Sequence, residues 1–347
     1  MGEPPRPEPG ADFWATEPPE PPCFDRARNS WILSRYRDVA AALRDPRLVP
    51  VSPLCTAAAV PLDGALHAEF REEGLRLVAP ARLRQWEGQF ALLAHRLAAA
   101  LPAGREVDLV AEYAKPWSRE VAGMAAGLPG DQLERLDGLA GAIFDAACQA
   151  YDVALEAKSR NAVQELARFF RGAPQLHMQM FIALAHSLPA FLGNAWLALA
   201  EHPAQWLRLR QEAALLPKAI DELLRFAGPA KAQFRQAVAK VALDGGTVSP
   251  QERVILRLDR ANRDPERFPD PQELRIDGRT GDHVALGGGV HACIGGMLIR
   301  AAAAVATRAL LDSCGLPARY TAVTADGFAM HYVKSLRVAR DAPAPLK

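Results

Sequence analysis

The spacing of hydrophobic positions predicts a mainly α protein. Apolar residues recur every three to four positions over most of the chain, as on the buried face of an amphipathic helix. Proline and glycine mark the ends of these stretches, where they stop one helix or precede the next. We predict helices over residues 37–44, 70–101, 120–126, 132–171, 178–216, 218–226 and 297–311.

Short runs between turn-forming segments predict small β-sheets. The predicted strands are residues 30–33, 233–237, 254–258 and a strand near 330–333. The N-terminal segment is rich in Pro, Glu and Gly, a composition typical of disordered chains. We therefore expect a disordered leader over residues 1–22 and a single domain over residues 23–347, because a chain of this length can fold as one large domain.

Composition narrows the classes of function. Half of the 347 residues are hydrophobic and the formal net charge is +1, so the chain can build a large core but carries no basic field for nucleic acid. No uninterrupted apolar run reaches the roughly 18 residues of a membrane span, and the N-terminus lacks the layout of a secretion signal. The cysteines show neither CxxC spacing nor a disulfide framework. We expect a cytoplasmic protein that binds neither nucleic acid nor membrane.

The most informative stretch is residues 286–295, Leu-Gly-Gly-Gly-Val-His-Ala-Cys-Ile-Gly, which precedes the predicted helix 297–311. Glycines let the backbone pass close to a large flat group. Backbone amides and the start of a helix favour the thiolate form of Cys293. A thiolate in such a loop suits a soft metal, and heme iron is held this way in one large enzyme class. The alternative is a buried cysteine that acts as a small hydrophobic residue.

Two charged pairs stand at helical spacing. Glu222 and Arg225 lie on one face of a predicted helix, where they can form an ion pair, which on its own would be an ordinary surface pair. His67 and Arg71 are one helical turn apart and can hold one anionic group together. A solvated charged face is the alternative for this second pair.

These motifs together resemble the cytochrome P450 family. Residues 286–295 match its heme-binding signature, Phe-Gly-x-Gly-x-His-x-Cys-x-Gly, at every fixed position except the first, where Leu286 stands in place of Phe. The Glu222–Arg225 pair and the proline-rich stretch 260–271 come in the family's order. The resemblance covers residues 30–338 and points to the soluble bacterial members. The chain is shorter than usual, because little sequence separates residues 47 and 67 and residues 171 and 178.

The resemblance implies the P450-like fold, in which long central helices and small β-sheets hold heme b (iron protoporphyrin IX) between a distal central helix and a proximal cysteine loop. It implies that Cys293 is the metal ligand. The residues that it assigns to cofactor binding, besides Cys293, are His67, Arg71, Arg235 and His291 for the propionates and Gly287, Gly289 and Gly295 in the loop. Glu222 and Arg225 would be structural.

The predicted central helix departs from the family's pattern. The family run Ala/Gly-Gly-x-Asp/Glu-Thr, whose acid and alcohol deliver protons, becomes Ala183, Leu184, Ala185, His186 and Ser187. Ser187 could relay a proton, and histidine is a competent donor near neutral pH. A histidine satisfied by a backbone carbonyl is the alternative for His186. Ala183, Leu184 and Leu188 are expected to line the substrate pocket, and Pro189 is expected to kink the helix.

The resemblance implies a monooxygenase-type oxidation of a small natural-product-like molecule, with O2 and with electrons from a separate ferredoxin and ferredoxin reductase. Because the acid–alcohol pair is replaced, a heme-thiolate enzyme with other chemistry is the alternative: a peroxygenase, a dehydratase, an isomerase or a catalyst of nitrogen-centred rearrangement. A non-catalytic P450-like scaffold is a third interpretation, and the retained Cys293, His291 and His67 argue against it.

Overall fold

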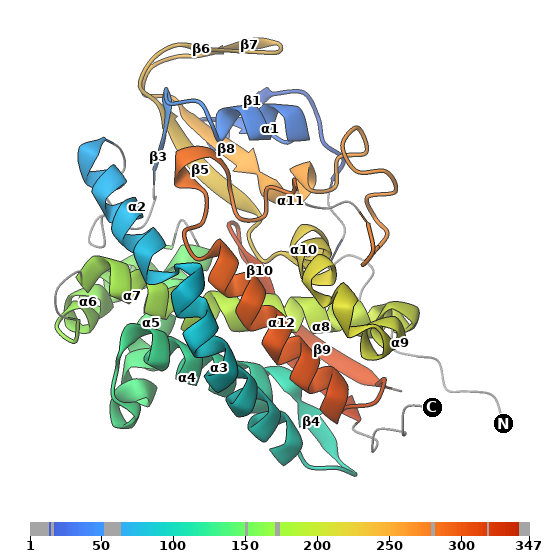
Figure 1. Cartoon of the computed structure of the whole chain (residues 1–347). Coiled ribbons are helices and arrows are strands. Elements are labelled where there is room, and N and C mark those ends of the chain that lie inside the picture. The colour runs from blue at the N-terminus through green and yellow to red at the C-terminus, as the bar shows by residue number, and fades with distance from the viewer. Residues whose placement is uncertain are drawn as a thin grey trace.

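The computed structural model describes residues 14, 17–51, 64–149, 152–170, 174–278, 282–317 and 319–339 (Figure 1). Its helices are α1 (Tyr36–Ala42), α2 (Ala65–Leu77), α3 (Pro80–Ala100), α4 (Lys115–Ala126), α5 (Leu133–Cys148), α6 (Val153–Ala167), α7 (Pro174–Ile182), α8 (Leu188–Glu201), α9 (Pro203–Gln211), α10 (Leu216–Ala227), α11 (Leu258–Ala261) and α12 (Gly296–Ser313). Two π-helical segments precede α4 and α8, Leu109–Ala114 and Ala183–Ser187. The prediction of a mainly α protein is confirmed.

The strands form small sheets. They are β1 (Cys23–Asp25), β2 (Ser30–Leu33), β3 (Leu48–Pro50), β4 (Glu106–Asp108), β5 (Ala232–Ala237), β6 (Val241–Leu243), β7 (Gly246–Val248), β8 (Arg253–Arg257), β9 (Tyr320–Asp326) and β10 (His331–Ala339). One sheet has the order β1-β2-β8-β5-β3, a second β4-β10-β9, and β6 and β7 form a hairpin. In Figure 1 the first sheet and α1 lie at one end of the molecule, and the long helices and the second sheet make up the rest.

The core is built around α8. Every residue from Leu188 to Ala200 is buried, because strand β10 and the helices α10, α12 and α9 pack around it. An all-round apolar helix has no face suited to solvent. The helical stretch Gln175–Glu201 is long and apolar enough to cross a membrane by length and composition alone, and 78% of its apolar window is buried inside the protein. That burial is the mark of a core helix.

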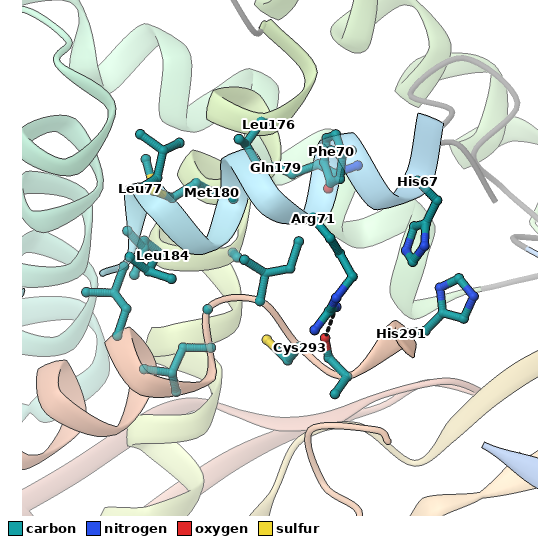
Figure 2. A pocket seen from close by; sticks show the side chains of 18 residues that line it. His67, Phe70, Arg71, Leu77, Leu176, Gln179, Met180, Leu184, His291 and Cys293 are labelled. Atoms are coloured by element: carbon teal, nitrogen blue, oxygen red, sulfur yellow. Dashed lines mark hydrogen bonds between the residues drawn. The ribbon is translucent and has the colours of Figure 1, made fainter. Parts of the chain in front are cut away.

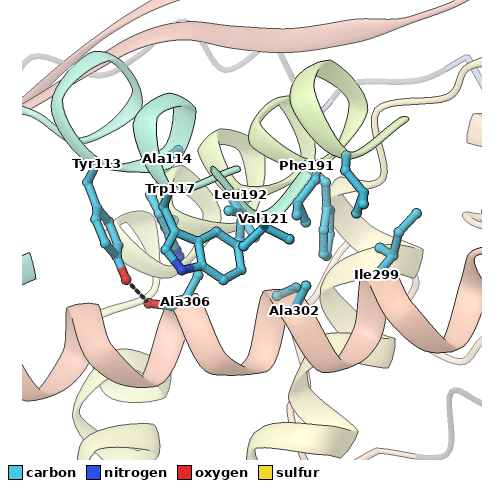
Figure 3. Close-up of a cluster of buried hydrophobic side chains, with 14 of the residues drawn as sticks. Tyr113, Ala114, Trp117, Val121, Phe191, Leu192, Ile299, Ala302 and Ala306 are labelled. Carbon is cyan, nitrogen blue, oxygen red and sulfur yellow. Dashed lines mark hydrogen bonds between the residues drawn. The ribbon is translucent and has the colours of Figure 1, made fainter. Parts of the chain in front are cut away.

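Helix α12, which follows the cysteine loop, packs on α3, α10, α8 and α9. Its inner face carries small residues such as Ala302 and Ala306, which let the large side chains of Trp117 and Phe191 approach (Figure 3). The hydroxyl of Tyr113 donates a hydrogen bond of 2.9 Å to the carbonyl oxygen of Ala306. The close packing fixes where α12 begins, and with it the end of the cysteine loop.

Three predicted helices are wrong in extent. The single helix predicted over 70–101 is two helices, α2 and α3, because Pro80 forces the preceding Ala79 into an extended conformation (ψ 146°). The helix predicted over 132–171 is also two, α5 and α6, and the side chain of Asp152 caps the second one. The helix predicted over 178–216 is divided by the π-helical segment Ala183–Ser187 and again at Pro203.

The remaining helices and the strands agree more closely with the prediction. The strand over 30–33 is β2, and those over 233–237, 254–258 and near 330–333 correspond to β5, β8 and β10. The strands β1, β3, β4, β6, β7 and β9 were not predicted. Most of these are only three residues long, too short for a periodic signal.

Part of the predicted leader is described and lies against the core. The indole Nε1 of Trp14 donates to a carboxylate oxygen of Glu201 at 2.5 Å, and its ring centroid lies 5.6 Å from that of Phe226. Residues 1–13, 15 and 16 lie outside the described residues, as do 52–63 and 171–173, where the chain is shorter than usual in the family pattern.

A buried ion pair on α10 ties the helical part to the loops that follow. Glu222 and Arg225 are 1% and 5% exposed, and they bond through both carboxylate oxygens at 2.7 and 2.8 Å. Arg225 also donates to the carbonyl oxygens of Asn262, Pro271 and Glu273. This pair is structural, as the resemblance implies, because its hydrogen bonds are all used within the fold.

We expect Glu222→Gln to lower the free energy of unfolding by about 3–5 kcal/mol, because it leaves the Arg225 charge buried without its counterion. Urea denaturation of the two proteins measures the difference. The control is Glu72→Gln, which removes an exposed pair with Arg76 on α2 and should cost less than about 0.5 kcal/mol. Equal losses in the two variants would contradict the structural role of the buried pair.

Candidate active site

The cysteine loop is shaped by glycines at positions that other residues avoid. Gly287 and Gly289 have φ of 71° and 65°, in the left-handed region that favours glycine. A Cβ at Gly289 would lie 2.5 Å from the carbonyl oxygen of Leu43. The backbone N–H of Cys293 donates to the carbonyl oxygen of Leu286 at 2.8 Å, which closes the loop. These constraints hold Cys293 just before the N-terminus of α12.

The sulfur of Cys293 faces a cavity of about 260 Å³. It is accessible from that cavity, while protein surrounds it on its other sides. Burial raises the pKa of the Cys293 thiol, although a backbone hydrogen bond from Gly295 and the charges of Arg300 and Arg71 act to lower it. In the protein alone the thiol form is therefore favoured, contrary to the predicted bias toward thiolate.

Three of the four predicted propionate residues line the same cavity as Cys293 (Figure 2). The rings of His67 and His291 are 4.2 Å apart between centroids, at one end of the cavity. Arg71 on α2 donates to the carbonyl oxygen of Ala292 at 2.7 Å. Segments more than 200 positions apart in the chain thus bring two imidazoles, a guanidinium and a thiol to one wall.

Arg235, the fourth predicted propionate residue, is buried on β5 and does not line the cavity. It is 4% exposed and donates to the carbonyl oxygen of Phe234 and to the side chain of Gln233, at 2.9 and 3.0 Å. Burial lowers its pKa to about 10. It forms no ion pair with any residue in the described part of the chain. A buried guanidinium without a carboxylate is costly, so it calls for an anion from outside the chain.

The opposite wall of the cavity is apolar except for Gln179 of α7. Ala183 and Leu184, from the π-helical segment, line it together with Met180 and Leu176 of α7. Leu188 is fully buried and lies outside the cavity lining. Of the three predicted pocket residues, the structure therefore brings two to the cavity.

The two predicted proton donors lie away from the cavity. His186 points toward α5, where its Nε2 lies 3.0 Å from the carbonyl oxygen and 3.1 Å from a carboxylate oxygen of Asp137, and its ring stacks on Phe144. Ser187 is half-buried and is not part of the cavity wall. The placement of His186 matches the alternative given above, a histidine satisfied by a backbone carbonyl, here with a carboxylate as well.

The π-helical segment explains this placement. Its hydrogen bonds run from residue i to i+5, so each turn takes about one residue more than an α-helical turn. In an α-helix Ser187 would follow Ala183 on the same face, and the wider turn moves it off that face. Pro189 supplies the cause, because it has no N–H to donate to the preceding turn. The structure has this π-helical segment directly before Pro189, and the kink expected there stays a prediction.

Several cavity residues were not predicted from the sequence. They are Phe70, Gly74, Leu77, Val78, Leu176, Gln179, Met180, Ala292, Ile294, Leu298 and Ile299. Those on α7 could have been found by counting back from Ala183 in steps of three and four, because that spacing stays on one helix face.

The residues of the site fit a large anionic metal complex such as heme. The sulfur supplies a soft ligand on one wall, and metal binding would stabilise its deprotonated form. His67, Arg71 and His291 supply donors at the rim, and the unpaired Arg235 lacks only an anion. The facing wall is apolar except for Gln179, which suits the flat macrocycle.

Comparison with known proteins gives the same assignment. Residues 201–316, which include the Glu222–Arg225 pair and the cysteine loop, match the family model described as Cytochrome P450. The chain is 43% identical over 124 residues to "Cytochrome P450 monooxygenase PikC" of Streptomyces venezuelae, a match that covers 35% of this chain and 30% of that relative. It is 27% identical over 311 residues to "Vitamin D(3) 25-hydroxylase" of Pseudonocardia autotrophica, covering 78% of this chain and 77% of the relative.

The fold agrees with solved structures along most of the chain. The P450BioI crystal structure, in complex with an acyl carrier protein, superposes with a TM-score of 0.83 at 20% identity and covers 90% of this chain and 92% of that one. The structure of CalO2 gives a TM-score of 0.83 at 21% identity, with 94% of both chains covered. The P450-like fold predicted from the sequence is confirmed. By the family model over residues 201–316, the bacterial relatives and the fold, this chain is similar to the cytochrome P450 family of heme-thiolate enzymes.

Proposed function

We propose that the protein oxidises a small, largely apolar, natural-product-like molecule in a monooxygenase-type reaction that uses O2 and electrons from an external ferredoxin and ferredoxin reductase. The observation that carries the proposal is the cavity itself, where Cys293, His291, His67 and Arg71 face an apolar wall. We place the enzyme in the cytoplasm of a bacterium, in line with its bacterial relatives.

The polar wall would hold heme b. Cys293 would ligate the iron, and the loop with Gly287, Gly289 and Gly295 would let the macrocycle approach the backbone. The donors His67, Arg71, Arg235 and His291 would bind the two propionates, which need charged partners in so apolar a site. Heme with a thiolate ligand supplies the oxidising chemistry when bound.

The apolar wall would hold the substrate. Leu184 and Ala183 reach the cavity directly, and Leu188 backs them from the core. These side chains exclude water and bind apolar surface, at about 25 cal/mol for each Å² that is buried. Leu184 stands where the family carries glycine, so it narrows the space over the cofactor.

A second candidate function is supported by the placement of His186 and Ser187 outside the cavity. Neither side chain lines the space where a proton would be delivered. Chemistry that needs no such delivery, as in a peroxygenase, a dehydratase, an isomerase or a nitrogen-centred rearrangement, is compatible with the same cavity. A proton relay from Ser187 would need a water molecule between its hydroxyl and the cavity.

The requirement for reductant and O2 separates the two candidate functions. The proposed monooxygenase should consume reductant and O2 in proportion to product, and hydrogen peroxide alone should not replace them. Product formation with peroxide in the absence of a reductase would favour the second candidate. Ser187→Ala should change turnover by less than about twofold if the hydroxyl lies outside the proton path.

We expect Cys293→Ala to abolish the strongly red-shifted absorbance band that the reduced protein gives with carbon monoxide, because that band requires thiolate ligation. Turnover should fall to background. Cys23→Ala is the matched control, since Cys23 is an exposed cysteine on β1, and it should keep both the band and the activity. A normal band in Cys293→Ala would refute the ligand assignment.

We expect Arg235→Met to affect the apoprotein and the heme-loaded protein in opposite directions. Without heme, the free energy of unfolding at pH 7 should stay the same or rise, because the variant removes a buried unpaired charge. With heme, retention of the cofactor should weaken by about tenfold, the worth of one charge-assisted hydrogen bond.

The pH dependence has a definite sign. Because the pKa of Arg235 is lowered to about 10, the unfolded chain binds more protons than the folded one above that pH. The free energy by which buried Arg235 destabilises the folded apoprotein should therefore shrink as the pH rises through 10.

The control for heme retention is Arg253→Met, which replaces an exposed arginine on the adjacent strand β8. Equal heme retention in both variants would contradict the role of Arg235.

A further inference from the structure

One face of α7 and the following π-helical segment forms a wall of the cavity. Its residues follow helical spacing, with steps of three and four positions, and they are Leu176, Gln179, Met180, Ala183 and Leu184. Four of these side chains are apolar. Gln179 alone brings hydrogen-bonding groups to this wall.

The side-chain amide of Gln179 is not used by the fold. Gln179 is half-buried, and its amide forms no hydrogen bond to any residue within the described part of the chain. A primary amide offers two donors and an acceptor with two lone pairs. Leaving these groups against apolar surface is unfavourable, so they need water or a bound molecule as a partner.

The other polar side chains of the cavity have a partner in the proposed function. His67, Arg71, His291 and Cys293 would all contact heme, which removes them from the recognition of a substrate. Gln179 then remains as the one polar side chain of the cavity lining that is free to select a substrate. This step rests on the proposed function.

We propose that Gln179 is the specificity-determining residue of this enzyme, and that it selects apolar substrates bearing a single carboxamide or lactam. An amide on the substrate presents a donor and an acceptor side by side, and the amide of Gln179 matches both at once. The apolar body of the substrate would then lie against Met180 and Leu184, which border the same wall.

The site discriminates by the cost of leaving Gln179 without a partner. A hydrocarbon of the same shape buries the same apolar surface but cannot replace the hydrogen bonds of the water it displaces. A substrate with an amide restores those bonds. The resulting preference is the kind that a buried polar group gives and an apolar pocket does not.

The test compares two isosteric probes on the heme-loaded protein. Cyclohexanecarboxamide and isopropylcyclohexane differ in the amide alone, and their dissociation constants can be measured by equilibrium dialysis in sealed cells. We expect the wild type to bind the amide more tightly than the hydrocarbon. Gln179→Leu should weaken amide binding by about fivefold or more and leave hydrocarbon binding unchanged or tighter.

A matched control lies on the same helix. Gln175 is an exposed glutamine one turn earlier on α7 and does not line the cavity. Gln175→Leu makes the same chemical change and should leave both dissociation constants unchanged.

Heme content and the carbon monoxide spectrum are recorded for every variant, so that two kinds of failure can be told apart. If the wild type binds no heme, the proposed function fails and this inference fails with it. If heme loading is normal but the wild type does not prefer the amide, or Gln179→Leu keeps that preference, only the role of Gln179 is overturned.

Discussion

The buried pair of Glu222 and Arg225 is the interaction on which the rest of the site depends. Two charges cannot stay inside a protein unless their hydrogen bonds are satisfied, and here the surrounding backbone satisfies them. Arg225 gathers the carbonyl oxygens of Asn262, Pro271 and Glu273, and Glu222 accepts from the backbone N–H of Arg275. These hydrogen bonds fix the irregular segment 262–275 against α10.

That fixed segment in turn positions the cysteine loop. The side chain of Asn262, whose carbonyl oxygen is bound by Arg225, accepts a hydrogen bond of 2.8 Å from the backbone N–H of Val284. The carbonyl oxygen of Val284 then accepts from Gly287, where the loop turns. A short series of hydrogen bonds therefore connects the pair on α10 to the backbone of the cysteine loop, so the pair can govern the geometry of the loop.

The molecule tolerates two unfavourable features where a cofactor would bind. Arg235 is buried without a carboxylate, and the pKa of the Cys293 thiol is raised. The buried Arg235 charge is a cost for the protein alone, whereas the raised pKa of Cys293 opposes only the loss of the thiol proton when a metal binds. One ligand that carries carboxylates and a metal would satisfy both groups. A stable fold can carry such costs at a functional site because the pair on α10 and the packing of α8 and α12 hold the surrounding structure in place.

The sequence by itself determined the local features of the protein. The glycine pattern around Cys293, the spacing of Glu222 and Arg225 and the helical periodicity depend on neighbours within a few positions. Each was predictable, although the breaks that divide the three longest predicted helices were missed. Tertiary structure decided which side chains reach the cavity. The π-helical segment before Pro189 turned His186 and Ser187 away and left Gln179 on the wall. Contacts between distant segments decide which face of the helix each residue occupies after the π-helical segment. They also decide the pKa of the Cys293 thiol in its packed loop. Periodicity along the chain does not encode such contacts.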